Sequence, residues 1–234
     1  MGRKPKRERP RKASVSGTDN REKAINALRA LLSEQRFEAV GFADIAERAG
    51  LSLAELRTEF PSKLAMLAAR NKDIDRAVLG GTEADTEEEP ARDRLFDVLM
   101  RRFEAMAGDQ GMVRELMHAA MRHPSLAFAL NGMAVTTQQW MLEAAGIGAS
   151  GPKGILRAQG IALLFARVAR VWVDDDDEGL ARTMAALDRE LNRAARWAGF
   201  LDDLCMIPET MCRIAARRPR RRPRGEDDET VEAA

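Results

Sequence analysis

Apolar side chains recur at helical spacing along most of this chain. The first apolar stripe follows the positions i, i+1, i+4, i+7 and i+8 of a helix, and it contains Ala24, Ile25, Leu28, Leu31 and Leu32. A capping box formed by Asp19 and Glu22 predicts that this helix begins near Asp19. The pattern therefore predicts an amphipathic helix close to the start of the chain.

The next two predicted elements are short helices joined by a tight turn. Residues 42–49 form the first, which ends at Gly50, a residue that can adopt a positive φ at the turn. Ser52 and Glu55 form the Ser-x-x-Glu capping box that starts the second. Small or apolar residues on the inner side allow the two helices to cross closely: Ile45, Ala46, Ala49, Leu51, Leu56 and Phe60. This arrangement predicts a helix-turn-helix.

A fourth helix is predicted from Ser62 to about Leu79, and the charged run 82–89 before Pro90 predicts a domain boundary. Beyond that boundary, helices are predicted near residues 90–107, 111–122, 124–145, 153–173 and 178–199, with a weaker one near 201–216. The helices 153–173 and 178–199 are expected to pair as an antiparallel hairpin.

Composition supports an all-α fold, because Leu, Ala, Met, Arg and Glu abound while β-branched residues are sparse. With 234 residues, 45% of them apolar, the chain can bury a sizeable core. We expect four parts: a basic disordered arm over 1–18, a helix-turn-helix domain over 19–80, a larger helical domain over 90–216 and a charged disordered tail over 217–234.

The net charge of +1 conceals a strong segregation along the sequence. Residues 1–12 carry +6, residues 213–224 carry +7 and residues 226–232 carry −5, which leaves −7 on the chain between the two basic segments. An acidic body repels a phosphate backbone, whereas basic arms are attracted to it through counterion release. The basic ends are either solubilising tails or, at the N-terminus, an arm that follows DNA beside the helix-turn-helix.

The sequence offers little chemistry for catalysis or metal binding. It has no Gly-x-Ser-x-Gly elbow, no His-Glu-x-x-His pair and no phosphate loop with a Gly-Lys-Ser/Thr ending. Cys205 and Cys212 are too few for a disulfide framework, and His118 and His123 lack further ligands at metal-binding spacing. No apolar run follows Met1, so a secretory signal is not expected. We predict a cytoplasmic protein that is not an enzyme and has no metal, cofactor or membrane span.

Residues 20–72 resemble the N-terminal domain of the TetR family of transcriptional regulators, through Ile-Ala-x-x-Ala-Gly at 45–50 and Phe-x-x-Lys at 60–63. The chain differs from the usual family pattern at three positions. It has Gly41 where family members usually have Thr, Arg57 where they usually have Tyr, and Glu59 where they usually have His or Tyr. The resemblance implies a DNA-binding domain followed by a helical ligand-binding and dimerisation domain. The residues expected to contact operator DNA are Gly41, Ala43, Ser52, Leu53, Ala54, Arg57, Thr58 and Lys63. Of these, Ala54, Arg57 and Thr58 are expected to face the groove, with Leu53 turned inward.

The resemblance also implies a homodimer formed through the final helical hairpin, and a small apolar effector bound among the helices of residues 90–145. Methionine and aromatic residues concentrate there, and such side chains fill irregular cores as readily as they line adaptable cavities. The residues expected to line the effector site are Phe96, Met100, Phe103, Met117 and Trp140.

A second resemblance leads to a different function on the same fold. Residues 166–176, together with Thr183 and residues 186–191, resemble the C-terminal part of the lipid-binding accessory proteins of ubiquinone biosynthesis. Those proteins keep a TetR-like fold and have lost their DNA contacts. The sequence therefore leaves two alternatives: a TetR-type regulator, with a repressor favoured, or a lipid-binding protein that does not bind DNA.

Overall fold

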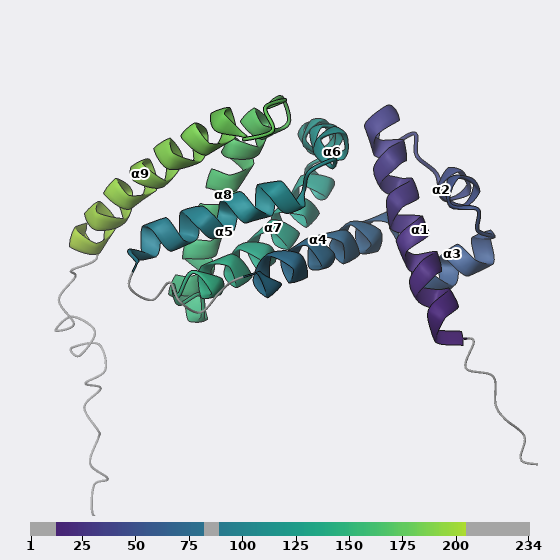
Figure 1. Ribbon diagram of the computed structural model, residues 1–234, viewed down its shortest axis with the longest axis horizontal. Helices are drawn as coiled ribbons and strands as arrows, with labels where there is room; N and C mark the ends of the chain where they lie inside the picture. The colour runs from purple at the N-terminus through teal and green to yellow at the C-terminus, as the bar shows by residue number, and fades with distance from the viewer. Residues whose placement is uncertain (1–12, 82–88, 205–234) are drawn as a thin grey trace, which may run out of the picture. The chain divides into compact units, whose positions relative to one another are not determined.

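The computed structural model describes residues 13–81 and 89–204, and its regular structure is helical throughout (Figure 1). The helices are α1 (Ala13–Glu34), α2 (Phe42–Ala49), α3 (Leu53–Glu59), α4 (Lys63–Gly80), α5 (Ala91–Ala105), α6 (Gln110–Arg122), α7 (Pro124–Ala144), α8 (Gly151–Trp172) and α9 (Ala181–Leu204). The predicted all-α fold is confirmed for the described residues. The chain up to Arg193 forms one compact unit.

The first core joins α1 to α2, α3 and the start of α4. Buried apolar residues from these helices and the segments that join them form it, with one residue of α6: Ala24, Ile25, Ala27, Leu28, Leu31, Leu32, Val40, Ile45, Ala46, Leu56, Phe60, Met66, Leu67 and Met112. The predicted stripe of the first helix and the inner side of the helix-turn-helix both lie in this core. Met112 fills it from α6, so the N-terminal helices pack directly on the rest of the unit.

Two of the predicted helix boundaries are wrong. Helix α1 begins at Ala13, so Asp19 lies inside the helix, where its Oδ2 accepts from Lys23 Nζ at 2.5 Å instead of capping the N-terminus. Helix α9 continues through the break expected between residues 199 and 201 and reaches Leu204. The rest of the weak helix predicted at 201–216 lies outside the described residues, as do residues 1–12 and the charged tail.

Helices α1 and α6 approach each other closely at Gly111. A Cβ added at Gly111 would lie 2.8 Å from the Cβ of Ser33 on α1, nearer than real Cβ atoms come. Glycine at this position therefore lets α6 lie directly against α1. The contact joins α6 to the helix on which α2 and α3 pack.

The second core lies among α5, α7, α8 and α9. Phe103 is fully buried in it, stacked on Phe165 with ring centroids 4.4 Å apart, and it also meets the ring of Trp172 at 5.7 Å. The acidic run before α9 contributes a helix cap, since Asp175 Oδ2 accepts from the backbone N–H and the hydroxyl of Thr183. Within the part of the chain that the structure describes, no helix is both long and apolar enough to cross a membrane.

Candidate functional site

The helix-turn-helix has well-defined turn geometry. Gly50 adopts φ 66° and ψ 35°, the left-handed conformation that glycine accepts without strain, and its N–H meets the carbonyls of Ala46 and Glu47. Ser52 caps α3: the Glu55 N–H donates to Ser52 Oγ at 3.2 Å, and Ser52 N donates back to Glu55 Oε2 at 2.8 Å. These bonds from Ser52 hold the pKa of Glu55 below its ordinary value. The capping box predicted from the sequence is confirmed.

Helix α3 presents an outer face that carries both polar and apolar side chains. Ala54, Arg57 and Thr58 are exposed on it, whereas Leu56 is buried in the first core. The Thr58 hydroxyl donates to the Ala54 carbonyl at 2.9 Å. The prediction that Leu53 turns inward is wrong, because it is 57% exposed at the first position of α3, beyond the reach of the core.

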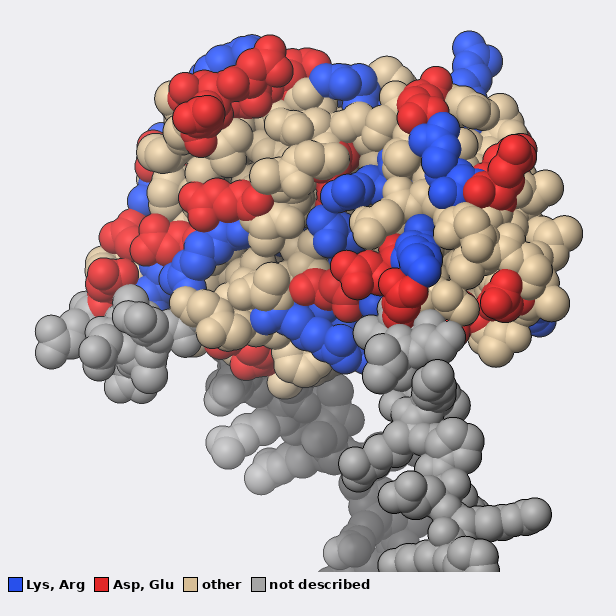
Figure 2. Space-filling model, turned by 45° about the vertical axis from the view of Figure 1, so that its right-hand side comes forward, with Lys and Arg blue, Asp and Glu red and all other residues tan. Residues whose placement is uncertain are grey.

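The charges around this face leave one arginine available to a phosphate or a base. The segment 41–60 carries four acids and two arginines. Arg48 is paired with Glu34 at 2.6 Å, whereas Arg57 has no hydrogen-bond or ion-pair partner among the described residues. The view in Figure 2 shows acidic and basic side chains interspersed, with no broad basic patch. Of the two arginines in this segment, Arg57 is therefore the one available to contact DNA.

The side chain of Lys63, at the start of α4, binds other residues of this protein. Its ammonium donates to the carbonyls of Phe37 and Val40 at 2.8 and 2.7 Å and lies 4.2 Å from the centroid of the Phe37 ring. Partial burial lowers the pKa of Lys63. This side chain, expected to touch a phosphate, holds the loop between α1 and α2 in place. The other residues expected to contact DNA, Gly41, Ala43 and Ser52, are exposed.

The same loop is held from its other side by the end of α6. Phe37 N donates to Glu115 Oε1 at 2.9 Å, and Arg122 bridges Glu115 and Glu38. His123 Nε2 lies 2.5 Å from Glu38 Oε1, so the His side chain binds the loop and does not cap a helix. The loop that leads into α2 is thus fixed by both α4 and α6.

A buried carboxylate forms a second connection between the N-terminal helices and the rest of the unit. Asp109, immediately before α6, is fully buried, and its two oxygens meet Arg29 of α1 at 3.4 Å and Arg70 of α4 at 2.9 Å. One side chain therefore joins α1, α4 and the start of α6. A movement of α6 would be transmitted to both helices.

A third connection lies deeper, where α4 meets α5 and α7. Arg102 of α5 is buried, with its side chain 4% exposed, and it pairs with Asp75 of α4 and donates to Asn71 Oδ1 at 3.2 Å. Thr137 of α7 donates to the other oxygen of Asp75 at 3.3 Å. Burial lowers the pKa of Arg102, and the neighbouring Asp75 carboxylate opposes that shift.

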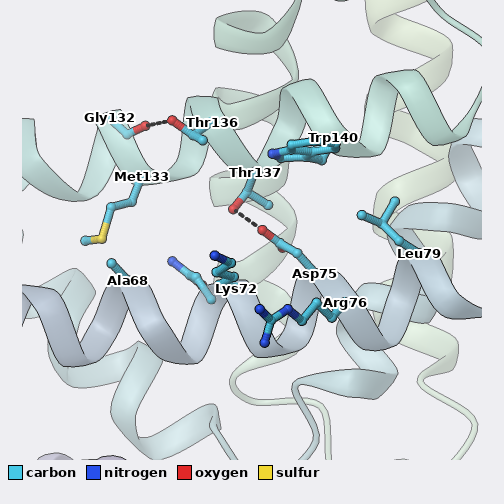
Figure 3. Close-up of a pocket in the computed structure, with 11 residues that line it drawn as sticks. Ala68, Lys72, Asp75, Arg76, Leu79, Gly132, Met133, Thr136, Thr137 and Trp140 are labelled. Atoms are coloured by element: carbon cyan, nitrogen blue, oxygen red, sulfur yellow. Dashed lines mark hydrogen bonds between the residues drawn. The ribbon is translucent and has the colours of Figure 1, made fainter. Parts of the chain in front are cut away.

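A cleft of about 660 Å³ lies between α4 and α7 (Figure 3). Its walls combine apolar and polar side chains from the two helices: Ala68, Asn71, Lys72, Asp75, Arg76, Leu79, Gly132, Met133, Thr136, Thr137 and Trp140. This volume is within the range of small-molecule sites. The cleft contains the Asp75–Thr137 hydrogen bond, so a ligand bound in the cleft would contact this link between α4 and α7 directly.

The five residues expected to line one effector site do not meet in a single cavity. Trp140 lines the α4–α7 cleft, whereas Phe103 and Met100 are buried in the second core. Phe103 also borders a smaller acidic hollow of about 440 Å³. Phe96 and Met117 are half-buried and line neither space. Helical spacing does not distinguish a core position from a cavity wall, and of the five side chains only Met100 and Phe103 are buried in the core.

Sequence reasoning missed Asp75, Arg102, Asp109 and Lys72. A signal was present for Arg102, which shares the helical face of Leu95, Leu99 and Met106, all of them buried. A charged residue on an apolar helical face predicts that its side chain is buried and paired with a side chain of opposite charge. Asp109 resembles an ordinary N-cap in sequence, and no local pattern identified its two arginine partners. Among the described residues, no group of three or more His, Cys, Asp or Glu side chains could hold a metal ion.

Comparisons with known proteins agree with this architecture. Residues 24–69 match the family model described as bacterial regulatory proteins, tetR family. A TetR transcriptional regulator from Nitrosomonas europaea is 24% identical with a TM-score of 0.59, over 75% of this chain and 97% of that one. A TetR-family regulator from Streptomyces coelicolor is 17% identical with a TM-score of 0.53, over 88% and 92%. These structures share the fold of this chain. No curated protein matches it.

Proposed function

We infer that this chain, which belongs through its N-terminal domain to the tetR family of bacterial regulatory proteins, is a repressor that binds operator DNA as a homodimer. The observation that carries the inference is the exposed face of α3, with its unpartnered Arg57, on a helix-turn-helix fixed by Gly50 and Ser52. The comparisons point to a regulator and give the lipid-binding alternative no support. We therefore do not propose that alternative.

The homodimer is proposed from an apolar surface on α8 together with the family resemblance. Leu156 and Leu163 are two helical turns apart on α8 and are 69% and 50% exposed. Met184 of α9 adds a further exposed apolar side chain. In a two-fold dimer, the recognition helices must lie about one helical turn of DNA apart, or a multiple of it. A ligand that favours another separation lowers the affinity for DNA.

Fluorescence anisotropy with the protein's own upstream region tests this function at a stated salt concentration. We expect tighter binding to that DNA than to an unrelated duplex of equal length. Equal affinity for the two duplexes at every salt concentration would contradict regulation of its own promoter.

The basic N-terminal arm, which lies outside the described residues, leads to a second prediction. Replacing residues 3–12 by a Gly/Ser segment of equal length removes seven basic side chains. The slope of log K against log salt should become shallower by about 0.9 for every phosphate that the arm neutralises, and binding should weaken for all sequences. The measurement is anisotropy from low to moderate salt. An unaltered slope would show that the arm does not bind DNA.

A further inference from the structure

The cleft between α4 and α7 combines an apolar surface with an unneutralised cation. Trp140 is 56% exposed and Met133 is half-buried, both on the α7 side, and Leu79 lies on the α4 side (Figure 3). A tryptophan ring left this exposed in a cleft of about 660 Å³ offers a flat apolar surface to a small molecule.

The charges of the cleft favour an anion. Lys72 is exposed and has no hydrogen-bond or ion-pair partner among the described residues. The acids nearest to it in sequence are already occupied: Asp75 binds Arg102 and Thr137, and Asp73 binds Arg21 at 2.9 Å. The negative charge of Asp75 is therefore balanced from inside the protein. The positive charge of Lys72 remains available to a ligand.

We propose that this cleft binds a small amphipathic carboxylate whose aromatic or alkyl part lies against Trp140 and Met133 and whose carboxylate pairs with Lys72. Its effect on DNA rests on the proposed function, whereas the binding itself does not. The site shares Trp140 with the effector site expected from the sequence but includes none of Phe96, Met100, Phe103 and Met117. It also uses α4, the helix that follows the helix-turn-helix directly.

Occupation of the cleft would act on α4. The Asp75–Thr137 hydrogen bond crosses it, and a ligand lying between the two helices competes with that bond. Helix α4 starts at Lys63, which holds the loop before α2 through the carbonyls of Phe37 and Val40. A shift of α4 relative to α7 would thus reach the helix-turn-helix. Ligand affinity and DNA affinity would then change each other by the same factor.

Three probes that share one ring system and differ in the charge of the head group test the proposal by calorimetry. They are 2-naphthoate, 2-naphthalenemethanol and 2-naphthylmethylammonium, each titrated into the full-length protein. We expect 2-naphthoate to bind about five- to tenfold more tightly than the alcohol, and the cation to bind most weakly. The Lys72→Gln variant should bind 2-naphthoate no more tightly than the alcohol. The matched control Lys153→Gln, at an exposed position on α8 outside the cleft, should keep the wild-type preference.

A second variant tests the location through shape. A Cβ added at Gly132 meets no heavy atom within 4 Å, so Gly132→Leu should fold normally and occupy part of the cleft. We expect it to weaken binding of both 2-naphthoate and the alcohol at least tenfold, with an unchanged melting temperature or a higher one. Equal affinities for the acid and the alcohol, binding unaffected by both variants, or no binding at millimolar concentration would each overturn the proposal. Charge-selective binding without an effect on DNA would leave the site standing and contradict its regulatory role.

Discussion

The Asp75→Ala variant should lose about 3–5 kcal/mol of its free energy of unfolding. Asp75 is the carboxylate that pairs with Arg102, whose side chain is 4% exposed beneath α4. Without it, the guanidinium keeps Asn71 as its polar partner and stays in the interior, where an unpaired charge is costly. Thr137 also loses its acceptor. Urea unfolding at neutral pH measures the loss as a lower midpoint at unchanged slope.

A matched control lies on the same helix. Asp73 pairs with Arg21 at 2.9 Å, but both side chains are about one third exposed, so Asp73→Ala should cost no more than about 1 kcal/mol. The double variant Asp75→Ala/Arg102→Met removes the orphaned charge and should recover much of the stability. Equal losses for Asp73→Ala and Asp75→Ala, or no recovery in the double variant, would show that burial of Arg102 does not cause the effect.

The Arg57→Ala variant should bind operator DNA about 1–3 kcal/mol more weakly if Arg57 contacts a base edge. Arg57 lies on the exposed face of α3 and has no partner among the described residues, so its removal should hardly change the stability of the fold. Anisotropy titrations of the operator and of a non-specific duplex, at one salt concentration, measure the loss.

Two further substitutions separate the roles open to Arg57. Arg57→Lys keeps a charge for a phosphate but loses the planar fork that binds guanine at two points, so it distinguishes the two kinds of contact. Arg170→Ala removes an exposed arginine of α8 that has no partner among the described residues, and it should leave DNA binding unchanged. If Arg57→Ala behaves like Arg170→Ala, Arg57 does not take part in recognition.

The parts of the fold that local patterns control were predictable. Gly50 and the Ser52–Glu55 pair specify a turn and a helix start within a few residues, and the structure has both. The inward face of α2 also follows from spacing alone, as buried Ile45 shows. Leu53 was misplaced because the first residue of a helix projects beyond the surface on which the next turn packs.

The connections between elements were not predictable in the same way, because helical spacing says which residues share a face but not which helix that face meets. Asp109 receives two arginines from α1 and α4, 80 and 39 residues away in the sequence. From its spacing Phe103 could have lined a cavity, but Phe165 and Trp172 of α8 pack against its ring and place it in the core. The proposed cleft depends likewise on the meeting of α4 with α7.

Selection of binding sites from a pool of randomised duplexes, with the full-length protein at moderate salt, tests the central claim that this helix-turn-helix reads DNA as a dimer. We predict enrichment of one inverted repeat whose half-sites are centred about one helical turn apart, or a multiple of it, and loss of that enrichment for Arg57→Ala. A pool that remains random, although the protein is folded and bound to bulk DNA, would contradict the account.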